Sequence, residues 1–176
     1  QSPDRHTKNK EVGVSEWNVN GMSMESGVKH TLHVRETLPS VLKKAGYKTI
    51  HVGKAHWGAI GTPGEEPLNL GFDVNIAGHA AGGPGSYHGT RNFSAAFRKG
   101  GAEWDVPGLE KYHGKDINLT EALTLEATRE MEKAVDEKKP FYLYMSHYAI
   151  HAPWEEDNRF LDKYKQMGLT DFEAIY

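Results

Sequence analysis

The sequence predicts an α/β fold with a mostly parallel sheet flanked by helices. The first observation is a helical pattern over residues 37–45, followed by Gly46 and a β-rich run over 47–52. The second is a long helical pattern over 118–139, followed by a continuous apolar run over 141–145. Ligands gather at the carboxyl ends of strands in open α/β sheets. The polar residues that follow each run are therefore the candidate site.

The composition favours one globular domain. The chain has 176 residues, of which 38% are hydrophobic, enough for a sizeable core. Its formal charge of -3 gives no basic stripe for a polyanion, so no nucleic acid is expected as a partner. No apolar stretch approaches the roughly 20 residues of a membrane span, so none is expected. The absence of cysteine excludes disulfides, thiolate metal sites and a cysteine nucleophile within these residues.

The first part of the chain predicts a lead-in and then a helix–strand unit. Residues 1–35 are polar and irregular, and we expect mostly loop there. In the next segment, residues 36–58, Thr37 suits a helix cap and Pro39 a first helical turn. The apolar positions on one face of this helix are Leu38, Val41, Leu42 and Ala45. The strand that follows ends at Gly53, where the segment becomes an active-site turn.

The middle of the chain, residues 59–116, predicts long loops with one short strand over 72–76. Long ordered loops usually carry function, so we expect these on the substrate side of the domain. Residues 78–85 are rich in glycine, but they lack the Lys-Ser/Thr pair of a phosphate-binding loop and no helix pattern follows. We interpret them either as a substrate-facing loop or as simple turns.

Residues 117–156 predict a second helix–strand unit that ends in a histidine loop. Asn118 and Glu121 have the spacing of a capping box, and Pro140 stops the helix. The apolar run over 141–145 is typical of a strand that is covered on both faces.

Short helices are predicted over the C-terminal residues, 157–176. The first spans about residues 158–167 and ends at Gly168. Its residues expected to face inward are Phe160, Tyr164 and Met167. Thr170 and Glu173 have the spacing of a capping box for a further helix. Because that helix starts so close to the last residue, we expect the domain to continue beyond it.

Lys54 and His56 stand one residue apart on the glycine-bounded turn 53–58. An ammonium group suits a sulfate or phosphate oxygen, and an imidazole donates or accepts a proton near neutral pH. These residue types therefore indicate an anion-handling site. Taken alone, however, such a short motif is more often a solvated surface loop.

His147 and His151 follow the second strand, with a spacing that would suit zinc on a helix. The glutamate of a His-Glu-x-x-His motif is missing, and Pro153 opposes a continuing helix. We therefore predict no metal ligands here. A structural role as hydrogen-bonded rings remains the alternative for either histidine.

Three segments in order resemble the type I, formylglycine-dependent sulfatases. Residues 37–58 resemble the second signature of that family, and 71–75 resemble the segment that follows it. Residues 139–154 resemble the later strand and its Pro-His-x-Pro-type loop, with Ile150 where proline is commoner. The three together are more specific than any one. The resemblance implies a partial alkaline-phosphatase-like sandwich and a sulfuric ester hydrolase.

The resemblance also assigns roles to the candidate residues. Lys54 would neutralise the sulfate and the oxygen of the nucleophile. His56 would help to release sulfate from the formylglycine adduct, and His151 would contact the bridging or leaving oxygen. His147 and His79 are weaker candidates for substrate contact. Fixed cations and donors at these oxygens make chemical sense, because charge builds there in the transition state.

The resemblance implies Ca²⁺ and formylglycine in the full-length protein, with neither bound by residues of this chain alone. The start of the chain superficially resembles the nucleophile motif, but the correct register would place Gln1 at the nucleophile. The family's early aspartate pair and its later Asp-x-Asn-type metal ligands have no match. We therefore expect residues 1–176 to be the central part of one sulfatase catalytic domain, truncated at both ends and inactive alone.

The expected substrate is a sulfated small molecule or a sulfated carbohydrate. Rings and polar groups that suit either come from His79, Tyr87, His88, Trp104 and Tyr112. Two alternatives stay open: a phosphoester or phosphonate hydrolase of the same superfamily, and a non-catalytic anion- or glycan-binding module. The family resemblance implies a periplasmic or secreted protein, although this chain shows no signal peptide pattern.

Overall fold

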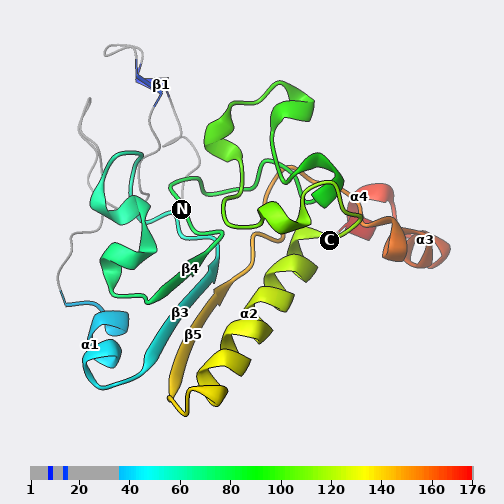
Figure 1. Ribbon diagram of the computed structural model, residues 1–176. Coiled ribbons are helices and arrows are strands. Elements are labelled where there is room, and N and C mark those ends of the chain that lie inside the picture. The colour runs from blue at the N-terminus through cyan, green and yellow to red at the C-terminus, as the bar shows by residue number, and fades with distance from the viewer. Residues whose placement is uncertain (1–7, 10–13, 16–35, 176) are drawn as a thin grey trace.

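The computed structural model describes residues 8–9, 14–15 and 36–175. Its centre is a three-stranded parallel sheet with the order β4-β3-β5, shown in Figure 1. The strands are β3 (Lys48–Gly53), β4 (Val74–Ile76) and β5 (Phe141–Ser146). Ile50 lies opposite Val74 on one side and Leu143 on the other. The predicted α/β class with a parallel sheet is confirmed, and the expected strand over 72–76 is shorter at its start.

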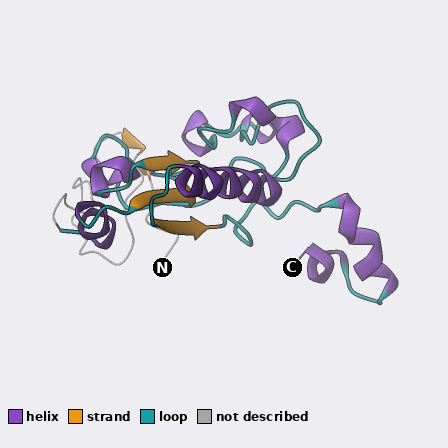
Figure 2. Ribbon diagram, turned by 60° about the horizontal axis from the view of Figure 1, so that its bottom comes forward, coloured by secondary structure: helices purple, strands orange, loops and turns teal. Residues whose placement is uncertain are grey.

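Strand β3 is buried on both faces. Because side chains alternate along a strand, Ile50 and Val52 project to one face and His51 to the other. Ile50 and Val52 belong to the main core, which includes Leu119 and Leu123 of the long helix α2 (Leu119–Asp136). In Figure 2, α2 lies along one face of the sheet. The candidate site residues that follow β3 therefore start from a strand that is packed on both faces.

The burial of strand β5 differs from the prediction. The strand lies at the edge of the described sheet, and its residues are half-buried or exposed, with Phe141 and Tyr144 both open to solvent. The expected cover on both faces is absent among the described residues, because α2 packs on only one side of this strand. A continuous apolar run indicates a strand but does not say what covers it.

Helix α2 begins at the predicted cap. The side chain of Asn118 accepts a hydrogen bond from the backbone N–H of Thr120 at 2.9 Å. Glu121, expected to complete a capping box, instead pairs with Arg159. The helix ends at Asp136, a few residues earlier than the pattern suggested. Its start is thus fixed by one side chain rather than two.

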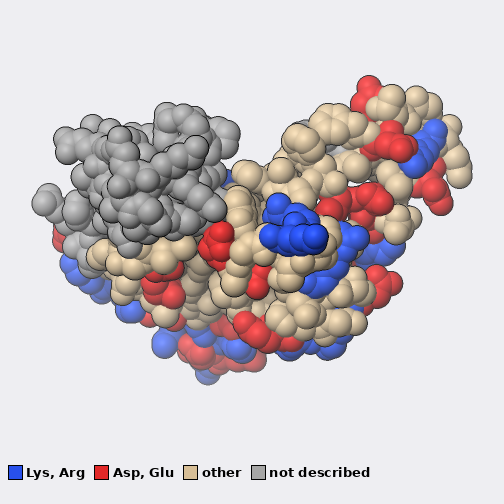
Figure 3. Space-filling model, turned by 90° about the horizontal axis from the view of Figure 1, so that it is seen from above, with Lys and Arg blue, Asp and Glu red and all other residues tan. Residues whose placement is uncertain are grey.

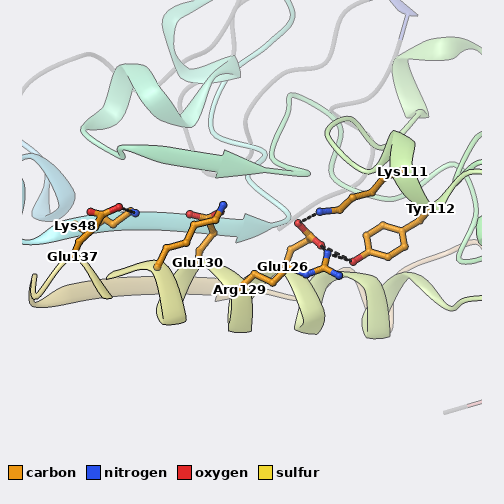
Figure 4. Close-up of polar contacts among 8 residues, drawn as sticks. Lys48, Lys111, Tyr112, Glu126, Arg129, Glu130 and Glu137 are labelled. Atoms are coloured by element: carbon orange, nitrogen blue, oxygen red, sulfur yellow. Dashed lines mark hydrogen bonds and ion pairs between the residues drawn. The ribbon is translucent and has the colours of Figure 1, made fainter. Parts of the chain in front are cut away.

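A row of ion pairs runs along α2, as Figure 4 shows. The Glu126 carboxylate is 7% exposed and accepts hydrogen bonds from the Lys111 ammonium, the Tyr112 hydroxyl and the Arg129 guanidinium. Burial acts to raise the pKa of Glu126, but its hydrogen bonds to Lys111 and Tyr112 hold it below the ordinary range. Further pairs are Lys133–Glu130 and Lys48–Glu137. The carboxylate of Glu126 ties the loop before α2 to the helix.

Helix α1 (Leu38–Lys44) has the predicted ends but not the predicted face. Thr37 caps it in a capping box with Ser40, and Gly46 follows it at φ +88°. Leu38 is nevertheless 59% exposed, and α1 has no buried residue. The helix packs against β3, but of its expected apolar face only Leu42 is half-buried, and Val41 and Ala45 are exposed like Leu38.

Short 3₁₀ turns fill the long connection between β3 and α2. They are η2 (Pro63–Glu65), η3 (Pro67–Leu70), η4 (Gly89–Arg91), η5 (Ala96–Arg98), η6 (Ala102–Trp104) and η7 (Glu110–Tyr112). In Figure 1 the green part of this connection that follows β4 lies beyond the arrowheads of the strands.

Most of the irregular lead-in predicted for residues 1–35, including the resemblance at Gln1, lies outside the described residues. Within it, β1 (Lys8–Asn9) and β2 (Val14–Ser15) form an antiparallel pair.

Two C-terminal helices, α3 (Asn158–Gln166) and α4 (Asp171–Ile175), follow the histidine loop. The predicted capping box is confirmed, because Thr170 N–H donates to Glu173 at 2.9 Å and Glu173 N–H donates to the Thr170 hydroxyl. The prediction that Phe160, Tyr164 and Met167 face inward is wrong. All three are exposed, since α3 packs mainly on α4 and both lie away from the sheet in Figures 1 and 2.

The described surface mixes both signs of charge. Seen from above the strand ends in Figure 3, Lys and Arg side chains lie among Asp and Glu side chains, with uncharged surface between them. Among the helices of the described residues, none is both long and apolar enough to cross a membrane.

Candidate anion-binding site

The ends of β3 and β5 meet at a very close approach. Gly53 lies opposite Ser146 in the register, and a Cβ on Gly53 would sit 1.9 Å from the Ser146 carbonyl oxygen. The backbone N–H of Lys54 donates to that oxygen at 2.7 Å. Gly53 also has φ +105°, which favours glycine. Lys54 and His147 thus begin two neighbouring loops at one edge of the sheet.

The ring of His51 contacts the backbone of Lys54, a role that was not predicted from the sequence. Its Nε2 lies 3.3 Å from the Lys54 carbonyl oxygen, and its Nδ1 lies 3.0 Å from Oδ1 of Asn75. The Asn75 amide donates to Glu66 and to the Gly78 carbonyl, which fixes its oxygen toward His51. Burial lowers the pKa of His51, and the two hydrogen bonds oppose this shift.

Aromatic rings surround His51. The ring of Trp57 lies 5.0 Å from it, that of Phe72 lies 5.4 Å away, and Tyr144 stacks at 5.7 Å. Because these rings come from the turn after β3, from the segment just before β4 and from β5, they fix the base of the site on three segments. Lys54 itself is half-buried, and this burial lowers the pKa of its ammonium group.

His56 is held on the turn by its backbone. It has φ +60°, a left-handed conformation that histidine adopts more readily than most residues, and its N–H donates to the His79 carbonyl at 3.0 Å. Only 7% of His56 is exposed. Burial lowers its pKa to about 4, and the charges of Lys54 and His151 act in the same direction. His56 is therefore a neutral imidazole near pH 7.

His79 has the same character. Burial lowers its pKa to about 4, with a further contribution from His56. Its ring lies 6.4 Å from that of Tyr148, and its Nε2 is buried with no hydrogen-bond partner among the described residues. His79 thus lies next to His56 as a second neutral imidazole.

His151 is anchored by Tyr87. The Tyr87 hydroxyl accepts from the His151 backbone N–H at 3.1 Å and lies 2.8 Å from the carbonyl oxygens of both Tyr148 and His151. The His151 ring has Nδ1 2.9 Å from the carbonyl oxygen of Ala152. Since that oxygen only accepts, Nδ1 carries a proton, and the neutral ring has its lone pair on Nε2.

The glycine-rich segment packs against these rings. Residues 80–87 are buried, and the choice between a substrate-facing loop and simple turns stays a prediction. A Cβ on Gly82 would lie 2.6 Å from the His56 ring, and one on Gly83 would lie 2.6 Å from Nδ1 of His151. The absence of side chains at these two glycines lets both imidazoles approach the same short segment.

The structure brings together Lys54, His56, His79 and His151, whereas His147 has no described contact with these side chains. His147 is exposed at the end of β5. Of the rings considered for substrate contact, Tyr87 and Tyr112 are buried. Within the described part of the chain, no group of three or more His, Cys, Asp or Glu side chains is arranged to hold a metal ion.

Comparison with known proteins defines the family. The fold and the site together describe an α/β protein with a lysine and neutral histidines at the carboxyl edge of a parallel sheet. A family model described as "Sulfatase" matches residues 12–173. The chain therefore belongs to the sulfatase family, as the three sequence motifs indicated.

Relatives and solved structures agree with this assignment. The chain is 31% identical over 147 residues to N-acetylgalactosamine-6-sulfatase of Mus musculus, covering 77% of this chain and 25% of that protein. It is 26% identical over 142 residues to arylsulfatase J of Mus musculus, covering 74% of this chain and 21% of the relative. The chain thus spans about a quarter of the length of these relatives.

The fold of Ps i-CgsB is similar as well. Its crystal structure matches with a TM-score of 0.56 and 25% identity, over 77% of this chain and 32% of that one. Its complex with k-i-k-neocarrahexaose gives the same TM-score at 23% identity, covering 78% and 32% of the two chains. The predicted partial alkaline-phosphatase-like sulfatase fold is confirmed.

Proposed function

We propose that the full-length protein hydrolyses sulfate esters and that this chain supplies Lys54, His56 and His151 to the sulfate pocket. The observation that carries the proposal is their convergence at the carboxyl ends of two adjacent strands. Lys54 follows β3 directly, and His56 and His151 both abut the pair Gly82–Gly83. Membership of the sulfatase family supports the same reaction.

The charges of the site suit a sulfate ester. The Lys54 ammonium neutralises a sulfate oxygen and the charge that develops on it during cleavage. The neutral His56, with a pKa of about 4, exchanges a proton rather than holding a fixed charge. His151 carries its proton on Nδ1 when neutral, so its Nε2 takes up a second proton and, once protonated, donates to the bridging or leaving oxygen.

Sulfatases use a formylglycine and a divalent metal, and we propose that the full-length protein does so with Ca²⁺. When bound, these groups supply the nucleophile and a positive charge beside it. The described residues of this chain do not fit a metal, and the chain has no cysteine. We assign the described residues of this chain the binding of sulfate and the movement of protons at His56 and His151.

The proposed substrate is a sulfated carbohydrate. One relative is a sulfatase named for an N-acetylgalactosamine 6-sulfate, and one structural neighbour was solved with a neocarrahexaose. A cavity of about 520 Å³ lined by His151 and Trp154, among others, has the size of typical small-ligand pockets. An aromatic wall suits the apolar face of a sugar. Such a substrate fits a periplasmic or secreted protein, as we also propose.

The test is activity of full-length variants on an aryl sulfate and on 6-sulfated N-acetylgalactosamine. Lys54→Ala, His56→Ala and His151→Ala should each reduce turnover by on the order of 10² or more. Lys44→Ala is the matched control, because Lys44 is exposed and pairs only with Glu36 among the described contacts. Wild-type turnover in all three site variants would overturn the proposal.

The same assay separates the alternatives. A phosphoester hydrolase would turn over an aryl phosphate faster than the aryl sulfate, with the same three variants impaired. A non-catalytic anion- or glycan-binding module would turn over neither ester but would still bind the ligand. We expect the protein to hydrolyse the aryl sulfate faster than the aryl phosphate, and to turn over the sulfate ester rather than only bind it.

A further inference from the structure

The segment from Gly82 to Tyr87 contacts both site imidazoles, and its first two glycines leave room for these rings. A Cβ on Gly82 would meet Cε1 and Nδ1 of His56 at 2.6 Å, and one on Gly83 would meet Nδ1 of His151 at 2.6 Å. Real Cβ contacts essentially never fall below 3.0 Å. Neither glycine has a positive φ, so alanine would fit the backbone and would clash only with its surroundings.

The other end of the segment holds the backbone of His151. The hydroxyl of Tyr87 accepts from the His151 N–H at 3.1 Å and donates to one of two carbonyl oxygens 2.8 Å away. Tyr87 is buried, so no solvent replaces these bonds. The histidine loop is therefore attached to the segment at both the ring and the main chain of one residue.

The buried carboxylate of Glu155 holds the segment from Gly82 to Tyr87 by hydrogen bonds. Glu155 accepts from the backbone N–H of Tyr87 at 2.6 Å, from the Ser86 hydroxyl at 2.8 Å and from Arg91 at 2.5 Å. Its side chain is 8% exposed. Because Glu155 lies just after the histidine loop, these bonds tie the segment to that loop a second time.

We propose that Gly82, Gly83 and Tyr87 are positioning residues that set the placement of His56 and His151 relative to each other. Gly82 lies against the ring of His56, and Gly83 lies against the ring of His151. Because the two glycines are adjacent, the backbone that limits the movement of one ring also supports the other ring. Misplacement of a reacting group by about 1 Å costs on the order of 10² in rate. The proposal rests on the proposed sulfatase function, whose turnover reports the placement of the rings.

The experiment uses the full-length enzyme with Gly82→Ala, Gly83→Ala and Tyr87→Phe. Each glycine variant should lower kcat at least tenfold with a smaller change in KM, and Tyr87→Phe should lower kcat about fivefold. Gly101→Ala is the matched control, because the atoms nearest to its Cβ would be the flexible carboxylate end of the Glu103 side chain. Tyr47→Phe, at an exposed tyrosine, is the control for loss of a hydroxyl. Both controls should keep wild-type turnover.

Double variants separate positioning from general damage to the fold. Gly82→Ala should cost nothing further in a His56→Ala background but should keep its full effect in a His151→Ala background. Gly83→Ala and Tyr87→Phe should show the reverse pattern. Equal losses in both backgrounds would overturn the proposal, as would wild-type kcat in Gly82→Ala and Gly83→Ala.

The outcomes also distinguish this proposal from the proposed function. If His56→Ala and His151→Ala keep wild-type turnover, the assignment of the site fails. If they lose turnover but the glycine and tyrosine variants do not, only the positioning role fails. Should the glycine variants not fold, the cycle of Tyr87→Phe with His151→Ala decides the matter alone, because it removes one hydroxyl and adds no atom.

Discussion

Acidification from pH 7 to pH 5 should destabilise the fold through His56 and His79. Burial lowers the pKa of each to about 4, from an ordinary value of 6.5. As the pH falls through 6.5, the unfolded chain takes up a proton at each of these positions, whereas the folded chain stays neutral until about pH 4. Stability is therefore fully present above the unfolded pKa and is lost as the pH falls toward the folded one.

The size of the loss follows from the two pKa values. Proton linkage gives about 2 kcal/mol for each histidine between pH 7 and pH 5. Below pH 4 both states are protonated, and the loss levels off at about 3 kcal/mol for each. Two histidines thus remove a large part of the stability of a typical domain.

The assay is urea unfolding of wild type and His79→Gln at pH 7 and pH 5 at constant ionic strength. The variant loses the contacts of the ring at both pH values. The change in unfolding free energy between pH 7 and pH 5, compared between wild type and variant, therefore reports the effect of the proton alone. His79→Gln should lose about 2 kcal/mol less than wild type on acidification, and His56→Gln should behave alike. An equal pH dependence in wild type and both variants would refute the reasoning.

Three further predictions concern packing and substrate. Gly53→Ala should destabilise the protein by more than about 2 kcal/mol in urea unfolding, because its Cβ meets the Ser146 carbonyl; an unchanged midpoint would contradict this contact. Glu126→Ala should cost about 1–3 kcal/mol by leaving the buried Tyr112 hydroxyl without its acceptor, and Glu126→Ala combined with Tyr112→Phe should cost less than the sum. Trp154→Ala should raise KM for a sulfated sugar more than for a small aryl sulfate; equal effects would remove the cavity from the substrate site.

Local signals in the sequence predicted the ends of elements well. The cap at Thr37, the left-handed Gly46 and the box at Thr170 and Glu173 all involve groups within a few residues of one another. Such interactions are decided by the segment itself. The parallel direction of the strands followed from the same logic, because two helix–strand units without a hairpin turn require parallel pairing.

Partners distant in the sequence were harder to predict. The apolar period placed Leu38 on the apolar face of one helix and Phe160 on that of another. It did not say whether anything covers those faces, and both residues are exposed. The glycine pair at 82–83 was interpreted as turn or loop chemistry, since its steric need comes from rings elsewhere in the chain. For the same reason no sequence pattern indicated that the His51 ring lies next to the Lys54 carbonyl oxygen.

The low pKa of His56 also links sulfate binding to pH. An anion beside the imidazole favours its charged form, so bound sulfate should raise the pKa of His56 from about 4 toward its ordinary value. Sulfate must then bind more tightly as the pH falls, by up to about twentyfold between pH 7 and pH 5. The inhibition constant of inorganic sulfate on the full-length enzyme measures this change, with His56→Gln as the variant that lacks the proton site. If wild type and His56→Gln gain the same affinity on acidification, the proton is taken up elsewhere and His56 does not face the sulfate.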